Sequence, residues 1–170
     1  MIRPEAVLDS WKAVRRDTAQ AVEDFSAAEL DFKPTPDCMT FGEIARHILE
    51  AGHALAGVLL DGVENLQTPE FRPMMGKFVA ELPQTPDAAG LAEALRQNLE
   101  TRAGQLAAQP PEFFAHVITR FDGQRVTRLE MLQFVKEHEL THRAQMFVYM
   151  RLKGLVPATT RRRLAKQQQA

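Results

Sequence analysis

Apolar residues recur at three- and four-residue intervals in four long stretches of the chain, with polar residues between them. This spacing places the apolar side chains on one face of an α-helix, so the pattern predicts four long amphipathic helices. We expect these helices at residues 4–25, 40–60, 87–110 and 127–154. Four amphipathic helices of this length bury their apolar faces against one another, which predicts an all-α fold, a four-helix bundle with antiparallel or crossover connections.

Residues at the expected helix starts support these boundaries. Thr40 and Thr127 are each followed three positions later by a glutamate, Glu43 or Glu130, which is the capping-box arrangement. Asp87 is a suitable N-cap for the third helix. The sequence therefore fixes three helix starts by local chemistry as well as by periodicity.

The chain between the helices is less regular. Residues 63–86 contain four prolines and form a long connection between the second and third long helices, with one short helical turn expected within it. Residues 111–124 are compatible either with two short strands or with irregular chain. Residues 1–158 are expected to form one domain, and residues 159–170 a polar, mobile C-terminal tail.

Composition excludes several classes of protein. With 21 basic and 22 acidic residues, a net charge of -1 provides no general attraction to nucleic acid or to an acidic membrane. The single cysteine, Cys38, cannot form an intrachain disulfide, which fits a reducing cytoplasm. The most apolar window, residues 51–60, is too short to span a bilayer. We therefore expect a cytoplasmic protein without nucleic-acid or membrane partners.

Three of the five histidines lie on apolar helix faces. His138 and His142 are four residues apart, so their rings lie one helical turn apart on one face, and His47 lies on the apolar face of the second helix. Three neutral imidazoles can bind one divalent ion and leave a position for water or substrate. Imidazole suits zinc, nickel, copper and iron, so ligand type does not select the metal. His53 and His116 are expected at the surface or in loops.

Five further residues carry side chains that could act near the three histidines. Glu43 lies one turn before His47 and is compatible with a second ligand shell, a fourth ligand or a general base, but capping is the simpler role. Glu139 points about 100° away from His138, so we expect a solvated or interface residue. Gln145 is expected to be structural and Tyr149 to belong to the core. Cys38 has no neighbouring base in the sequence that would activate it as a nucleophile.

Two segments carry a family resemblance. Residues 41–48 (FGEIARHI) resemble the second-helix motif of the DinB-like (YfiT-like) metal-binding helix bundles. Residues 138–145 (HELTHRAQ), followed by 149–154 (YMRLKG) and Pro157, are similar to the fourth-helix signature, although Ala144 replaces the usual glycine. The resemblance implies an up-down-down-up bundle, a homodimer, and His47, His138 and His142 as metal ligands. Relatives include thiol-dependent transferases and isomerases and metal-dependent hydrolases.

The sequence thus supports two functional hypotheses. The first is a metal-dependent transferase or hydrolase that activates a thiol or water for an unidentified small-molecule substrate. Its cofactors would be zinc or nickel, with iron as a further option, and a low-molecular-weight thiol. The second is a non-enzymatic dimeric helix bundle with a structural or sensory metal. No catalytic residue outside the metal ligands is evident in the sequence.

Overall fold

A computed structural model describes the chain except for residues 1–2, 26, 81–86 and 170. Four long helices form its body, and their bounds agree closely with the expected ones. They are α1 (Pro4–Asp24), α2 (Phe41–Leu60), α4 (Ala88–Ala107) and α6 (Arg128–Leu152). The prediction of an all-α four-helix bundle is confirmed.

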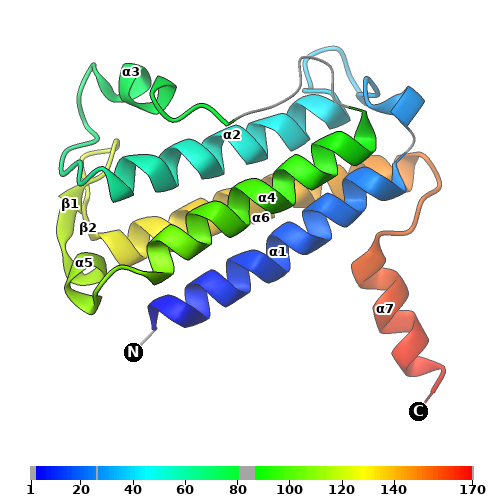
Figure 1. Cartoon of the computed structure of the whole chain (residues 1–170). Coiled ribbons are helices and arrows are strands. Elements are labelled where there is room, and N and C mark those ends of the chain that lie inside the picture. The colour runs from blue at the N-terminus through cyan, green and yellow to red at the C-terminus, as the bar shows by residue number, and fades with distance from the viewer. Residues whose placement is uncertain (1–2, 26, 81–86, 170) are drawn as a thin grey trace.

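The four helices have an up-down-down-up arrangement. In Figure 1, α1 and α6 run in one direction, whereas α2 and α4 both run in the opposite direction. Packing contacts connect α1 with α4, α4 with α2, α2 with α6 and α6 with α1, so the helices close into a ring in that order. Because α2 and α4 are parallel neighbours, the connection between them must return along the whole bundle. A 20-residue helix is about 30 Å long, which accounts for the length of this connection.

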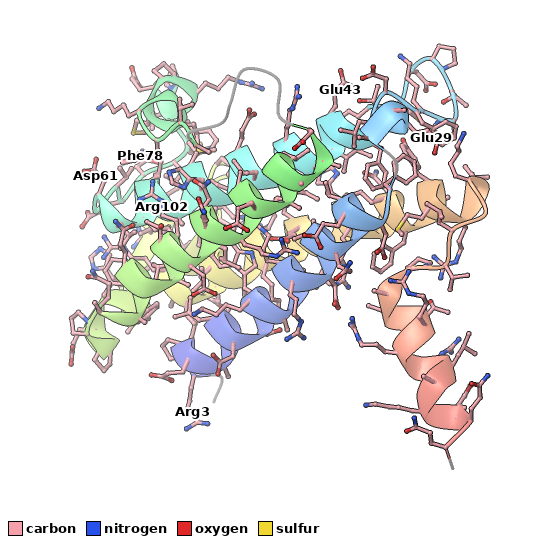
Figure 2. All side chains as sticks on the ribbon, turned by 45° about the vertical axis from the view of Figure 1, so that its right-hand side comes forward. Arg3, Glu29, Glu43, Asp61, Phe78 and Arg102 are labelled. Carbon is pink, nitrogen blue, oxygen red and sulfur yellow. The ribbon has the colours of Figure 1, made fainter. Side chains whose placement is uncertain are left out.

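The helix ends form through the local interactions that the sequence predicts. The Thr40 hydroxyl accepts the Glu43 backbone N–H at 3.1 Å, and the Glu43 carboxylate accepts the Thr40 backbone N–H at 2.7 Å. Thr127 and Glu130 repeat this capping box at α6. Gly154 ends α6 with a φ of +76°, a conformation that disfavours residues with a side chain. Glu43, at the opposite end of α2 from Asp61, is thus engaged in capping (Figure 2).

Short elements close one end of the bundle. A helix, α5 (Pro111–Ala115), precedes an antiparallel hairpin of β1 (Val117–Thr119) and β2 (Arg125–Thr127), in which Ile118 pairs with Val126. The two-strand alternative for residues 111–124 is therefore only partly right. Residues 117–119 form a strand, residues 111–115 are helical, and the second strand begins at residue 125. At the other end of the bundle, a 3₁₀ turn, η1 (Ala27–Glu29), follows α1 and lies near the start of α2.

The connection between α2 and α4 is attached at two places. At its start, Leu66 N–H donates to the Thr119 carbonyl at 2.8 Å, which joins the connection to the hairpin. The expected helical turn is α3 (Phe71–Gly76). Further along, the Phe78 ring packs so closely over Gly57 that a Cβ at this glycine would lie 2.6 Å from the ring. The connection therefore crosses over α2, and residues 81–86 lie outside the described part of the chain.

The core consists of two apolar clusters, one in each half of the bundle. One includes Phe41 and Met146, near the end of the bundle where α2 begins. The other includes Leu59 and Val135, near the hairpin. Between the two clusters, the middle of the bundle contains buried polar side chains.

This polar layer is built on Glu139, which is 2% exposed. Its carboxylate accepts hydrogen bonds from Trp11 Nε1 at 2.7 Å, from Arg15 Nε at 2.8 Å and Nη2 at 2.9 Å, and from the Thr18 hydroxyl at 2.8 Å. Arg15 also donates to the Leu95 carbonyl at 2.9 Å. The expectation that Glu139 is a solvated or interface residue is wrong. It faces the bundle interior because it lies about 100° from His138 toward α1.

Helix α2 also borders this polar layer, and a glycine on it leaves room for the Arg15–Glu139 ion pair. At Gly52 of α2, a Cβ would lie 3.0 Å from Arg15 Nη2 and 3.3 Å from the Trp11 ring. A side chain there would push the guanidinium away from its carboxylate partner. The three helices α1, α2 and α6 are therefore matched to one another at this level.

The C-terminal segment is polar, as expected, but it is helical, and its mobility stays a prediction. Residues Ala158–Gln167 form a helix, α7, that projects from the bundle near the end of α6 (Figure 1). Arg161 contacts Asp24 at 2.6 Å and Arg162 contacts Asp17 at 2.6 Å, so ion pairs hold α7 beside α1. Apart from Ala158 its side chains are not buried, so its sequence lacks the apolar stripe that would have revealed it.

Within the residues that the structure describes, none of the helices is both long enough and apolar enough to cross a membrane.

We predict that Glu139→Ala lowers the free energy of unfolding by about 3–5 kcal/mol, because Arg15 would remain buried without its countercharge. Urea unfolding followed by circular dichroism measures this change. The matched control is Glu137→Ala, which removes an exposed carboxylate from the same helix and is expected to change stability by less than about 0.5 kcal/mol. Equal losses of unfolding free energy in the two variants would show that the buried network does not stabilise the fold more than an exposed carboxylate does.

Candidate metal centre

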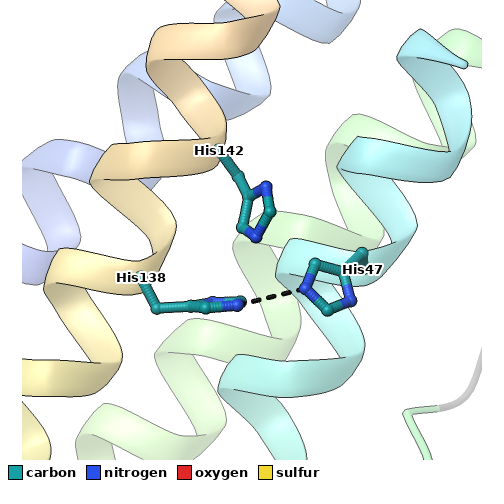
Figure 3. Close-up of side chains that lie close together, drawn as sticks. All are labelled: His47, His138 and His142. Atoms are coloured by element: carbon teal, nitrogen blue, oxygen red, sulfur yellow. Dashed lines mark hydrogen bonds between the residues drawn. The ribbon is translucent and has the colours of Figure 1, made fainter. Parts of the chain in front are cut away.

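Three histidine side chains meet on the side of the polar layer where α2 and α6 adjoin. Figure 3 shows His47 extending from α2 toward His138 and His142, which extend from successive turns of α6. The ring centroids are 4.5–4.9 Å apart, and one ligand atom from each ring lies within 4.8 Å of the others. The three residues singled out in the sequence are therefore brought together, and each is partly buried.

The spacing of the nitrogens suits one divalent ion. His47 Nε2 lies 3.1 Å from His138 Nε2. Two ligands at about 2.0–2.1 Å from a tetrahedral zinc ion lie about 3.3 Å apart. A hydrogen bond between the two rings would also give this distance, but it would leave His142 without a part in the arrangement. The convergence of three rings is better explained by a shared ligand.

The surroundings favour neutral rings, the form that binds metal. Burial lowers the pKa of His138 to about 4, and the neighbouring His142 and His47 add to the effect. Burial followed by the charge of His142 also lowers the pKa of His47, while Glu50 opposes this shift. Protons therefore compete weakly for these two rings at neutral pH.

Gln145 orients the third histidine of the group. Its side-chain oxygen lies 2.8 Å from His142 Nδ1, so this nitrogen carries the proton and donates it to the amide oxygen. The lone pair of His142 Nε2 is thereby left for an ion. The sequence reasoning assigned Gln145 a structural role and missed this contact. The signal was present in its position three residues after His142 on the same helix face.

The remaining sequence candidates are engaged elsewhere. The Tyr149 hydroxyl donates to the Met39 carbonyl at 3.1 Å within the core cluster, as expected for a core residue. Cys38 Sγ lies 3.1 Å from the Thr35 hydroxyl, near the start of α2. Neither residue belongs to the histidine group.

The other two histidines are also separate from the group. His116 is exposed and pairs with Glu64 at 2.9 Å. His53, which was expected at the surface or in a loop, lies within α2 and is half-buried between α2 and α4. Arg102 donates to its Nε2 at 2.9 Å, and burial followed by the Arg102 charge lowers the pKa of His53 to about 4.

Comparisons with known proteins agree with this architecture. A family model described as the DinB family matches residues 1–170. The chain belongs to the DinB family. An uncharacterized DinB-like protein of Bacillus subtilis, YjoA, is 26% identical over 154 residues, which are 91% of this chain and 93% of YjoA.

Two solved DinB-like structures share the fold. The crystal structure of B. subtilis YjoA has a TM-score of 0.68 and 26% identity, covering 87% of this chain and 92% of that one. A DinB-like protein from Bacillus cereus also has a TM-score of 0.68, at 21% identity, with coverage of 90% and 94%. These DinB relatives support the bundle, whereas the histidine geometry comes from this chain alone.

We predict that His142→Ala lowers the metal content of the purified protein at least as much as His138→Ala, because each removes one of three ligands. His53→Ala is the matched control, since His53 is half-buried on the same helix as His47 but contacts Arg102. Elemental analysis after purification without an affinity tag measures the content. Equal metal content in the three variants would refute the assignment.

We further predict that Gln145→Ala weakens metal binding by about 10- to 100-fold, the usual effect of removing a partner that orients a ligand histidine. Gln145→Glu keeps an acceptor for His142 Nδ1–H and is expected to retain most of the affinity. Competition with a chromophoric chelator measures both, with Gln133→Ala as a control on α6. Affinity within twofold of wild type in Gln145→Ala would show that the contact is incidental.

Proposed function

We propose that this DinB-family protein is a metal-dependent transferase or hydrolase with His47, His138 and His142 as its ligands. The observation that supports the proposal is the convergence of three partly buried ring nitrogens within 4.8 Å. A bound zinc or nickel ion would act there as a Lewis acid that activates a thiol or water and polarises an electrophile. Three histidines leave a coordination position for such a molecule.

The residues of the chain have distinct parts in this proposal. His47 and His138 are kept neutral by burial, and Gln145 fixes the tautomer of His142. Glu139 is not available as a base, because four hydrogen bonds already occupy its carboxylate. It holds α6 in the rotation that turns its two histidines toward α2.

The proton released by the nucleophile needs an acceptor. Glu43 is committed to the cap of α2, whereas Glu50 is exposed and its charge reaches His47. Glu50 is therefore the carboxylate that we assign as proton acceptor, directly or through solvent. A thiol, with a pKa near 8.5, requires much less activation than water, which favours thiol transfer over hydrolysis.

The alternative function is a non-enzymatic bundle in which the metal is structural or sensory. It requires the same three ligands but a closed coordination shell. The homodimer expected from the family resemblance, and the small-molecule substrate, both stay predictions. Metal coordination separates the two functions, because an enzyme needs a position that an exogenous molecule can occupy.

We predict that ethanethiol added to the cobalt-loaded protein produces a thiolate-to-cobalt charge-transfer band in the near ultraviolet. The band should be missing in His138→Ala, which lacks a ligand, and present in His53→Ala. A small anion such as azide is expected to perturb the cobalt spectrum as well. A spectrum that neither thiol nor anion changes would show a closed shell and favour the non-enzymatic alternative.

A further inference from the structure

A row of aromatic rings leads away from the histidine group along α6. Phe134 lies four residues before His138, so it occupies the same helix face one turn nearer the hairpin. Its ring centroid is 5.5 Å from that of Phe121, which is 5.7 Å from that of Phe71. The three rings come from α6, the hairpin and α3, so the chain gathers them from three separate elements.

The row keeps apolar surface accessible. Phe121 is 39% exposed, and Phe71 and Phe134 are only partly buried where they pack on the core cluster near the hairpin. On the facing helix, Ala51 lies one turn beyond His47 and offers only a methyl group. Three adjacent rings that each keep part of their surface accessible, one of them on the helix face that carries His138, indicate a binding surface.

A hollow at the far end of the row has room for a ring. It has a volume of about 450 Å³ and is lined by Phe71 and Phe121 but not by Phe134, with Gln67, Thr68 and Arg72 as its polar residues. Benzene already binds in apolar cavities of roughly 150 Å³. The size of the hollow is therefore compatible with an aromatic ring.

The charge differs between the two ends of the row, with Arg120 beside Phe134 and the exposed Arg72 in the lining of the hollow. Arg120 lies over the Phe134 ring at 5.4 Å, but both of its contacts to Asp122, at 3.0 and 2.5 Å, neutralise the guanidinium. It therefore covers one face of Phe134 without offering a free positive charge. Stacking and apolar burial are therefore the chemistry available at Phe134, whereas Arg72 adds a positive charge at the hollow.

We infer that Phe134, Phe121 and Phe71 form a shelf that binds an aromatic or similarly planar apolar group of the substrate while its reactive end lies at the three histidines. This inference rests on the proposed function for the reactive end. The inference extends the proposed function by naming the class of substrate as aromatic. An aliphatic molecule of the same reactivity would gain nothing from stacking on the rings. Phe134 is the specificity-determining residue, because it is the ring nearest the ligands.

The test compares two thiols on the cobalt-loaded protein through the charge-transfer band. Phenylmethanethiol is expected to bind about tenfold more tightly than ethanethiol, since aromatic contacts and apolar burial together supply at least the tenfold increment. Phe134→Leu and Phe121→Ala should reduce the preference to less than about threefold. Phe113→Leu is the matched control, because Phe113 is also half-buried, under Arg128 and against Phe114.

A second measurement separates this inference from the proposed function. Saturation-transfer NMR with phenylmethanol on the metal-free protein reports ring binding without metal chemistry, and the signal should be lost in Phe121→Ala but not in Phe113→Leu. Binding of phenylmethanol without a thiolate-to-cobalt charge-transfer band would contradict the proposed function but not the aromatic shelf. Equal affinity for both thiols, or ring binding that survives Phe121→Ala, would overturn the shelf.

Discussion

The buried pair of Arg15 and Glu139 is the interaction on which the arrangement of this bundle depends. It joins α1 to α6 in the middle of the molecule, where neither charge can be hydrated. Removing two charges from water is costly, so the pair is tolerated only with its full set of hydrogen bonds. Trp11 and Thr18 complete that set. A rotation or slide of α6 would break several of these bonds at once.

The position of the candidate metal centre follows from this constraint. Glu139 and His138 are consecutive residues on α6 and point about 100° apart. When the carboxylate faces α1 inside the bundle, the two histidines necessarily face the junction with α2. The same layer that divides the apolar core therefore packs behind the three histidines. Gln145 then sets which nitrogen of His142 is free.

The crossover topology determines which side chains lie along α2 and α6 beyond this centre. Parallel packing of α2 and α4 requires a long return segment, and that segment is fixed to the hairpin at Leu66 and to α2 at Gly57. Its course brings Phe71 beside Phe121, and Phe121 beside Phe134. The aromatic shelf is thus a product of topology, because its rings come from residues that are up to 63 positions apart (71 to 134).

Much of the local structure was determined by the sequence alone. The boundaries of α2 and α6 depend on side chains within three residues of the helix starts, and the i, i+4 spacing of His138 and His142 requires only helical geometry. The burial of Glu139 and the helix α7 could not be inferred in the same way. A buried carboxylate and an exposed one look alike in sequence until the partner helix is known, and α7 is held by ion pairs without an apolar stripe. Only the tertiary structure decided which charges are buried and which distant rings meet, because both depend on how the helices pack.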